Sequence, residues 1–265
     1  MTDTDEAADI FAGTEEYYAS HRPGYGEETV AFLRERFDLD GSERVLDLGC
    51  GAGQIAIPLA SHVGSVVGMD PNEAMLRQAE ARAAEAGVEN VEWVVGSDAD
   101  VDADLGTVDL TTMGRSFHWM DQAATLDRIH DVTAPGGGGG VAIVTDGEWL
   151  TKGTEPWQET VYAVADRYLD DLPERVHPDD VDYDPWDELV ASRGFDDART
   201  DVVEFDREWD VDGIVGYVFS LSFCSPERFG DDAADFEADL RETLADDDAD
   251  TFVQHVTVSV VTGVR

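Results

Sequence analysis

The feature that most constrains the fold is the alternation of short apolar segments with helical segments between residues 28 and 146. Each apolar segment is too short for a helix, and most of them end in glycine or an acidic residue. The predicted strands cover residues 44–49, 64–70, 91–96, 108–114 and 141–146. The predicted helices cover residues 28–37, 54–62, 72–87 and 120–133. This order predicts βαβ units, a parallel sheet with helices on both faces, and a ligand site at the carboxyl ends of the strands.

The second half of the chain has a weaker pattern. Residues 214–223 fit either a helix or a strand, because they form one apolar run. Helices are expected over 157–169, 187–194 and 233–247, and strands over 198–210 and 251–264. Because no linker divides the chain, we expect a single domain over 1–265. It would comprise an N-terminal lid segment (1–26), a cofactor-binding core (27–146), and a part that completes the sheet and adds helices on the substrate side (147–265).

A glycine-rich turn, DLGCGAG at 47–53, follows the first predicted strand of the sheet. A dinucleotide fingerprint that starts at Gly49 would need its third glycine at Gln54, and the phosphate-loop pattern fails because no Gly-Lys-Ser/Thr follows. Asp47 stands before the glycines, where a carboxylate would repel a pyrophosphate but attract an ammonium group. The turn therefore favours an ammonium-bearing ligand.

Acidic residues also follow the next two predicted strands. Asp70 ends the second strand, where a carboxylate can accept hydrogen bonds from both ribose hydroxyls. Asp98, beside Ala99, follows the third strand and is placed to meet an adenine amino group. Dinucleotide enzymes also use an acid like Asp70, so this residue alone does not decide between cofactors.

Together these motifs resemble class I S-adenosylmethionine (SAM)-dependent methyltransferases, in particular the group known as methyltransferase domain 11. The resemblance rests on DLGCGAG, on Asp70-Pro-Asn-Glu-Ala-Met-Leu, on Asp98-Ala99, on Ser116-Phe-His-Trp119 and on the Pro-Gly-Gly turn at 135–137. A Tyr-Tyr-Ala-Ser-His-Arg-Pro-Gly-Tyr box at 17–25 is similar to the subgroup of trans-aconitate methyltransferase. The match is good over residues 15–146 and loose beyond them.

The resemblance implies a Rossmann-like α/β fold with a doubly wound, mostly parallel sheet of seven strands, and extra C-terminal helices. It also implies SAM as cofactor and S-adenosylhomocysteine as product. The cofactor-binding residues that it implies are Asp47 for the ammonium, the Gly49, Cys50 and Gly51 backbone and Ser116 for the methionine part, Asp70 for the ribose, Pro71, Asp98 and Ala99 for the adenine, and Gln54 beside the turn.

The residues expected on the acceptor side lie near the lid and the fourth strand. Tyr18, Arg22 and Trp119 are the candidate substrate-binding residues, and Arg22 suits a bidentate pair with a carboxylate. His118 is the candidate catalytic base, needed only if the acceptor must lose a proton. A carboxylate acceptor held by Arg22 therefore competes with a carbon or oxygen acceptor deprotonated by His118.

The charge balance restricts the partners. The chain has 60 acidic and 17 basic residues, a formal net charge of −43, and the acid is spread along its whole length. Such self-repulsion is tolerable where salt screens it, so we expect a protein from a halophile. The charge disfavours nucleic acid and anionic membranes. The acidic N-terminus does not resemble a secretory signal, which predicts a cytoplasmic protein, and no cysteine or histidine spacing predicts a metal site.

The function expected from the sequence is methyl transfer from SAM to a small molecule. Two alternatives stay open at this stage: a SAM- or nucleotide-binding protein without catalysis, and an NAD-dependent oxidoreductase. The missing third glycine and the presence of Asp47 argue against the oxidoreductase. Whether the protein is a monomer or a dimer is left open.

Overall fold

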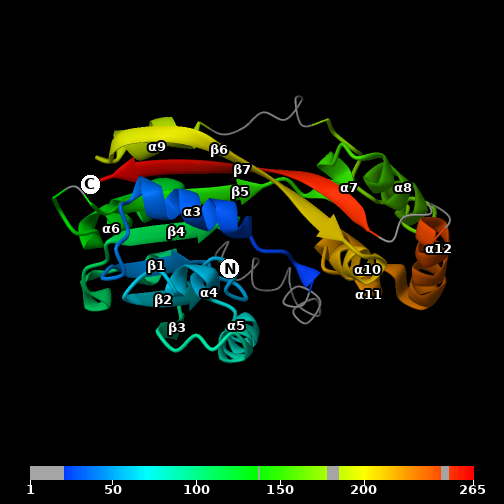
Figure 1. Ribbon diagram of the computed structural model, residues 1–265, viewed down its shortest axis with the longest axis horizontal. Helices are drawn as coiled ribbons and strands as arrows, with labels where there is room; N and C mark the ends of the chain where they lie inside the picture. The colour runs from blue at the N-terminus through cyan, green and yellow to red at the C-terminus, as the bar shows by residue number, and fades with distance from the viewer. Residues whose placement is uncertain (1–20, 137, 178–184, 246–250) are drawn as a thin grey trace.

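A sheet of seven strands in the order β3-β2-β1-β4-β5-β7-β6 forms the centre of the molecule (Figure 1). The computed structural model describes residues 21–136, 138–177, 185–245 and 251–265. The strands are β1 (Arg44–Leu48), β2 (Ser65–Asp70), β3 (Val91–Val95), β4 (Leu110–Gly114), β5 (Gly140–Asp146), β6 (Asp196–Trp209) and β7 (Phe252–Val264). Neighbouring strands from β3 to β5 are parallel, while β7 is antiparallel to both β5 and β6. The predicted seven-stranded, mostly parallel α/β sheet is confirmed.

Helices cover both faces of the sheet, as right-handed crossovers require. On one face, α3 (Gly26–Arg36) and α4 (Ala56–Ala60) share a hydrophobic core with Val45 and Leu110. On the other face, α6 (Gln122–Val132) and α9 (Trp186–Ser192) pack on side chains such as Leu46 and Ile143. Alternate residues of one strand therefore belong to different cores, which explains why these strands are apolar throughout.

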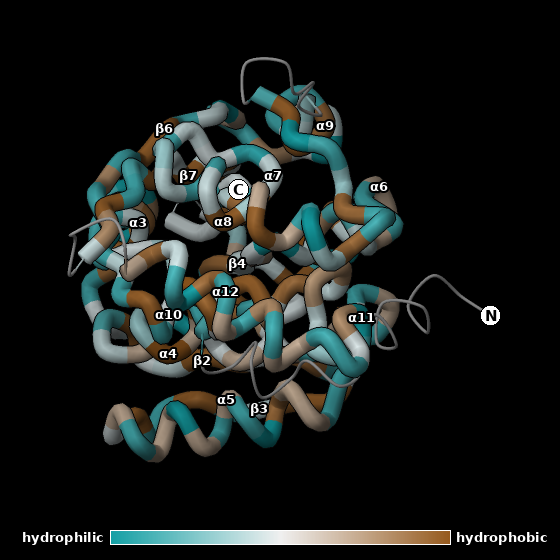
Figure 2. The backbone as a smooth tube through the Cα atoms, turned by 90° about the vertical axis from the view of Figure 1, so that its right-hand side faces the viewer, coloured by the Kyte–Doolittle hydropathy of each residue, from teal (hydrophilic) through white to brown (hydrophobic). Residues whose placement is uncertain are grey.

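Helix α5 (Glu73–Glu85) follows β2 and begins at the predicted N-cap. The Asn72 side chain accepts hydrogen bonds from the backbone N–H groups of Ala74 and Met75. Along α5 hydrophilic and hydrophobic residues alternate (Figure 2), and its buried residues include Met75 and Leu76. The cap fixes where the chain leaves β2, directly beside Asp70.

Strands β6 and β7 extend beyond the rest of the sheet. Val258 of β7 pairs with Asp146, the last residue of β5, and also with Val203 of β6. The pairing of β6 with β7 continues from there to Trp209 and Phe252. This two-stranded arm passes the carboxyl edge of the sheet and reaches a group of helices, which we call the helical lobe (Figure 1).

The helical lobe has its own hydrophobic core, which includes Trp209 and Phe252 from the end of the arm. Its helices are α7 (Trp149–Lys152), α8 (Pro156–Ala165), α10 (Val211–Phe219), α11 (Pro226–Phe229) and α12 (Ala233–Ala245). Short 3₁₀ helices complete the described elements: η1 (Asp98–Asp100), η2 (Ala103–Leu105), η3 (Phe117–Trp119), η5 (Ser222–Cys224) and η6 (Gly230–Asp232). None of the helices in these described ranges combines the length and apolar character that a membrane span needs.

Two predicted elements differ from the structure. The ambiguous run 214–223 is helical only up to Phe219, within α10. Asp210 accepts from the Gly213 N–H at the start of this helix, and every residue from Ile214 to Phe219 is buried in the lobe. Burial on all sides removes the periodicity that separates helix from strand. The helix expected over 54–62 is shorter, since the glycine turn continues to Ile55 and α4 begins only at Ala56.

Candidate functional site

The glycine turn after β1 is held in a conformation that glycine alone adopts readily. Gly49, Gly51 and Gly53 have φ values of 69°, 54° and 81°. A Cβ atom on Gly49 would lie 2.4 Å from the Cβ of Ser116, so β4 approaches this turn closely. The amides of Gly49 and Cys50 both donate to the Met69 carbonyl, at 2.8 and 3.1 Å. Both amides are therefore used within the protein, and the backbone groups of these two residues left to contact a ligand are their carbonyl oxygens.

Asp70 connects the glycine turn to the start of α5. Its Oδ2 accepts from the Gly51 N–H at 2.8 Å, and its Oδ1 accepts from the Asn72 N–H at 2.9 Å. Burial raises the pKa of this carboxyl, while the two N–H donors lower it. The carboxylate is thus fixed in orientation at the end of β2, beside the turn.

Asp47 is almost completely buried and bonds within the protein. Its Oδ1 accepts from the Thr112 hydroxyl at 2.8 Å, and its Oδ2 accepts from the Ala56 N–H at 3.0 Å. Burial raises the pKa of Asp47 to about 7, and the nearby charge of Asp70 adds to the effect. Asp47 therefore joins β1, β4 and α4, and its predicted contact with a ligand ammonium stays a prediction.

The third acid, Asp98, lies at the start of η1 and is also buried. Its Oδ2 accepts from the Thr125 hydroxyl at 2.9 Å and lies 3.6 Å from Nη1 of Arg128, so α6 holds this carboxylate in place. Its neighbour Ala99 and the distant Pro71, which follows β2, are both exposed. Buried, oriented acids therefore stand at the carboxyl ends of β2 and β3, with exposed apolar groups beside them.

The end of β4 carries the predicted residues Ser116, His118 and Trp119. The Ser116 hydroxyl donates to the Leu48 carbonyl at 2.8 Å, which ties this turn to the end of β1. The rings of His118 and Trp119 lie 4.8 Å apart, and Trp119 is 41% exposed. Partial burial and the positive charge of Arg115 lower the pKa of His118, which therefore favours the neutral form near pH 7.

Residues 21–26, the part of the lid segment that the structure describes, run across the carboxyl edge of the sheet. The Gly24 carbonyl accepts from the Arg207 guanidinium of β6, at 2.5 Å. The guanidinium carbon of Arg22 lies 5.1 Å from the ring centroid of Tyr217, on α10. This part of the chain therefore touches both the sheet and the helical lobe. Tyr18 lies outside the described residues.

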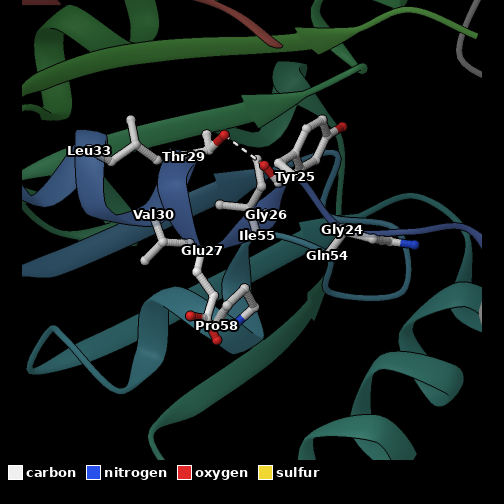
Figure 3. A pocket seen from close by; sticks show the side chains of 10 residues that line it. All are labelled: Gly24, Tyr25, Gly26, Glu27, Thr29, Val30, Leu33, Gln54, Ile55 and Pro58. Atoms are coloured by element: carbon white, nitrogen blue, oxygen red, sulfur yellow. Dashed lines mark hydrogen bonds between the residues drawn. The ribbon is translucent and has the colours of Figure 1, made fainter. Parts of the chain in front are cut away.

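Gln54 closes the turn on the side of the lid segment. It lines a pocket between the starts of α3 and α4, together with Tyr25, Val30 and Pro58 (Figure 3). The side chain of Gln54 points away from the other lining groups of this pocket. Among the described residues, no group of three or more His, Cys, Asp or Glu side chains is arranged to hold a metal ion.

A comparison with protein families covers the same part of the chain. Residues 45–137 match the family model of a methyltransferase domain. Over these residues the chain is therefore similar to a methyltransferase domain. The matched residues run from β1 to the glycine run before β5 and include the glycine turn, Asp70, Asp98 and Ser116.

Proteins similar to this chain cover most of its length. An uncharacterized methyltransferase-like protein of Schizosaccharomyces pombe is 27% identical over 208 residues, which are 78% of this chain and 75% of the relative. A candidate type II methyltransferase from Anaeromyxobacter dehalogenans has a similar fold, with a TM-score of 0.57, 23% identity, and coverage of 91% of this chain and 96% of the other. A SAM-dependent methyltransferase from Thiobacillus denitrificans, solved with S-adenosylhomocysteine, gives a TM-score of 0.51 at 22% identity, with 95% and 97% coverage. The two solved structures support the fold of this chain.

Three residues beside the site were not predicted from the sequence: Arg115, Arg207 and Tyr217. Tyr217 is buried and stacks on Trp149, with 4.5 Å between the ring centroids. Its hydroxyl accepts a hydrogen bond from the backbone N–H of Trp149 at 3.3 Å. Arg207 lies over the rings of Phe205 and Trp209, and burial lowers its pKa. Of the three, only Arg207 could have been noticed in the sequence, because it is a basic residue within a strongly acidic predicted strand. Arg115 and Tyr217 have partners on elements far apart in the chain, and Arg207 also contacts the distant Gly24.

Proposed function

We propose that this protein is a methyltransferase that transfers the methyl group of SAM to a small-molecule acceptor. The observation that carries the proposal is the pair of buried acids, Asp70 and Asp98, fixed at the carboxyl ends of the neighbouring strands β2 and β3, next to the glycine turn that follows β1. Methyl transfer is a displacement at carbon that mainly requires alignment, so a rigid cofactor site supplies much of what the reaction needs.

In this proposal each part of SAM meets a different element. Asp70 accepts from the ribose hydroxyls, and Pro71, Asp98 and Ala99 surround the adenine. The Gly49 carbonyl and the Gly51 and Cys50 backbone face the methionine part, with Ser116 and Gln54 beside it. Asp47 acts on the ammonium group through water, because its side chain is almost completely buried.

The acceptor would bind between the carboxyl edge of the sheet, the lid segment and the helical lobe. Arg22 and Arg207 approach this region from two elements. The Arg22 guanidinium lies over the Tyr217 ring, and the Arg207 guanidinium contacts the Gly24 carbonyl. Arg207 forms no ion pair with a carboxylate in the described part of the chain, although acids outnumber bases by 60 to 17. A half-buried guanidinium of this kind favours a carboxylate-bearing acceptor over a neutral one.

His118 would serve as the base if the acceptor is a hydroxyl or carbon acid, and it would have no proton to remove from an ionised carboxylate. Its lowered pKa suits the first role. Trp119 and Tyr18 would contact the acceptor from two sides. The Arg22-Pro23-Gly24-Tyr25 part of the lid segment supports, by resemblance only, a relation to the trans-aconitate methyltransferase subgroup.

The remaining proposals concern the setting of the protein. The net charge of −43 supports an origin in a salt-rich cytoplasm and argues against nucleic acid as the acceptor. The alternatives, a non-catalytic SAM-binding protein and an NAD-dependent oxidoreductase, are less well supported because of the methyltransferase match over 45–137.

A screen for released S-adenosylhomocysteine tests the activity. Small carboxylates, alcohols and amines are incubated with SAM and the protein in concentrated KCl. We expect turnover with a carboxylate, a loss of turnover in Arg207→Gln that Arg207→Lys restores in part, and unchanged SAM binding in both. Product release with none of the acceptors, from a protein that binds SAM, would favour the non-catalytic alternative.

A further inference from the structure

Helix α10 of the helical lobe carries a buried glycine in its interior. Gly216 stands where alanine would form the more stable helix, because glycine loses more backbone freedom on folding. A Cβ atom on Gly216 would lie 2.2 Å from both Cγ and Nδ1 of His21, and 2.5 Å from its Cδ2. The three nearest atoms all belong to one imidazole ring, so the glycine leaves a notch in the helix surface that this ring fills.

The next residue of each segment makes a second contact. The guanidinium carbon of Arg22 lies 5.1 Å from the ring centroid of Tyr217, within the range of cation–π contacts. The Tyr217 ring is itself held in place, because it stacks on Trp149 at 4.5 Å and packs edge-on with Trp209 at 5.3 Å. Two consecutive residues of the lid segment therefore rest on two consecutive residues of α10.

Strand β6 holds the lid segment a few residues farther along. The Gly24 carbonyl accepts from the Arg207 guanidinium at 2.5 Å, and a Cβ atom on Gly26 would lie 2.6 Å from Cζ of the Phe205 ring. Gly26 also has a φ of 83°, a conformation that glycine adopts readily. The chain before α3 thus lies along the arm and runs toward α10 (Figure 1).

Tyr25, between these contacts, reaches the sheet instead. Tyr25 is buried, and a Cβ atom on Gly114 would lie 2.9 Å from its hydroxyl oxygen. Gly114 is the last residue of β4, directly before the turn that carries Ser116 and His118. The lid segment therefore joins the helical lobe to the carboxyl end of β4.

We propose that Gly216 and Tyr217 form a docking face on α10 for the lid segment. The notch at Gly216 receives the His21 ring. The Tyr217 ring holds the Arg22 guanidinium where it would meet an acceptor, a consequence that rests on the proposed function. A side chain that fills the notch would release the segment, whereas the same side chain would be harmless once the His21 ring is absent.

A double-mutant cycle, followed by thermal unfolding in concentrated KCl, tests the docking. Gly216→Ala is made in the wild type and in His21→Ala. In His21→Ala we expect Gly216→Ala to raise Tm by about 2–4 °C, because alanine is the better helix former and the ring is gone. In the wild type that gain should be absent or reversed, because the added methyl group meets the ring. An equal rise in both backgrounds would overturn the inference.

The cycle stays informative if Gly216→Ala alone does not fold. Recovery of folding in the double variant would then support the docking face, and failure of both variants would contradict it. Gly138→Ala is the matched control, because its added Cβ atom would have no other atom within 4 Å and the residue lies before β5.

Hydrogen exchange, read by mass spectrometry on peptides that contain residues 21–26, reports the docking directly. Exchange should be about tenfold faster or more in Gly216→Ala and in Tyr217→Leu. It should stay near the wild-type rate in Gly138→Ala and in Tyr217→Phe, which keeps the ring. Wild-type exchange in both Gly216→Ala and Tyr217→Leu would overturn the inference. Titration of the same samples with SAM tests the proposed function, so the two proposals can fail separately.

Discussion

The acids of the cofactor site differ in what holds them. Asp70 accepts from two backbone amides, Asp98 from a hydroxyl with an arginine nearby, and Asp47 from a hydroxyl and an amide without any basic partner. Desolvation therefore dominates at Asp47, and its pKa of about 7 follows from burial without a compensating cation. The apo protein carries at this position an acid that is close to half protonated at neutral pH.

This burial predicts a pH dependence that belongs to Asp47. Because the folded-state pKa is raised from 3.8 to about 7, the unfolded chain loses the proton first as pH rises. Asp47 then lowers the free energy of unfolding progressively between about pH 4 and pH 7, by a few kcal/mol at most, and by a constant amount above that range. In Asp47→Asn this contribution disappears, so the variant should gain stability relative to wild type between pH 4 and pH 8.

Denaturant unfolding of both proteins at each pH, in concentrated KCl, measures the difference. Comparing the two proteins removes the pH dependence that all the other carboxylates share. A difference that stays constant from pH 4 to pH 8 would show that Asp47 titrates normally.

At the scale of residues, the sequence predicts which side chains stand near the cofactor but not how they are held. Asp47, Asp70 and Asp98 are predicted because each lies near the carboxyl end of a strand. The partners Thr112 and Arg128 lie on other elements, at sequence positions that carry no motif. Arg115 was missed for the same reason, since neither its left-handed backbone nor its pairing with Asp146 has a local signal.

At the scale of elements, glycine-rich turns let separate strands approach one another. Gly49 packs against Ser116, which follows β4, and a Cβ atom on Gly140 would lie 2.0 Å from the Gly263 carbonyl of β7. A Cβ atom on Gly139 would lie 2.3 Å from the Asp109 carbonyl. The glycines at 139 and 140, beyond the Pro-Gly-Gly turn, are therefore required by close backbone contacts, which no local pattern predicts.

The close approach at Gly49 predicts a specific effect of Gly49→Ala. The added Cβ would meet the Ser116 side chain at 2.4 Å, in addition to the cost of φ 69°. We expect a loss of about 2–4 kcal/mol in the free energy of unfolding and a weaker affinity for SAM. Gly87→Ala is the control: Gly87 has φ 68° but no atom within 4 Å of its would-be Cβ.

Gly87→Ala should lose only about 1–2 kcal/mol and bind SAM like the wild type. Thermal unfolding and SAM titration of the two variants separate backbone strain from the steric contact. Equal losses of unfolding free energy in both variants would mean that the close contact between Gly49 and Ser116 adds nothing to the cost of backbone strain.

At the scale of the whole molecule, the alternation of strands and helices predicted the sheet well. It could not predict that β6 and β7 extend past β5, because the register of a long antiparallel pair depends on contacts with the helical lobe. It also left 214–223 open, since α10 is buried on every side from Ile214 to Phe219. The part that encloses the proposed acceptor site is therefore the part that the sequence describes least.

The net charge is a property of the whole molecule, and its consequence is a dependence of stability on salt. Repulsion among 60 acidic residues opposes the compact state and is screened over about 3 Å at 1 M ionic strength. We expect the free energy of unfolding to be larger in about 3 M KCl than in 0.1 M KCl. Chemical unfolding by urea, which adds no charge, measures it, and equal stability in the two salts would contradict the proposed adaptation.

The central claim is that the carboxyl edge of the sheet binds SAM through Asp70, and calorimetric titration tests it most directly. SAM, S-adenosylhomocysteine and NADH are titrated into the wild type, into Asp70→Asn, and into Asp104→Asn as a control on an exposed acid. We predict binding of SAM and S-adenosylhomocysteine without NADH, a loss of about tenfold to a hundredfold in Asp70→Asn, and no change in Asp104→Asn. Binding of NADH in place of SAM, or equal SAM affinity in wild type and Asp70→Asn, would contradict the account.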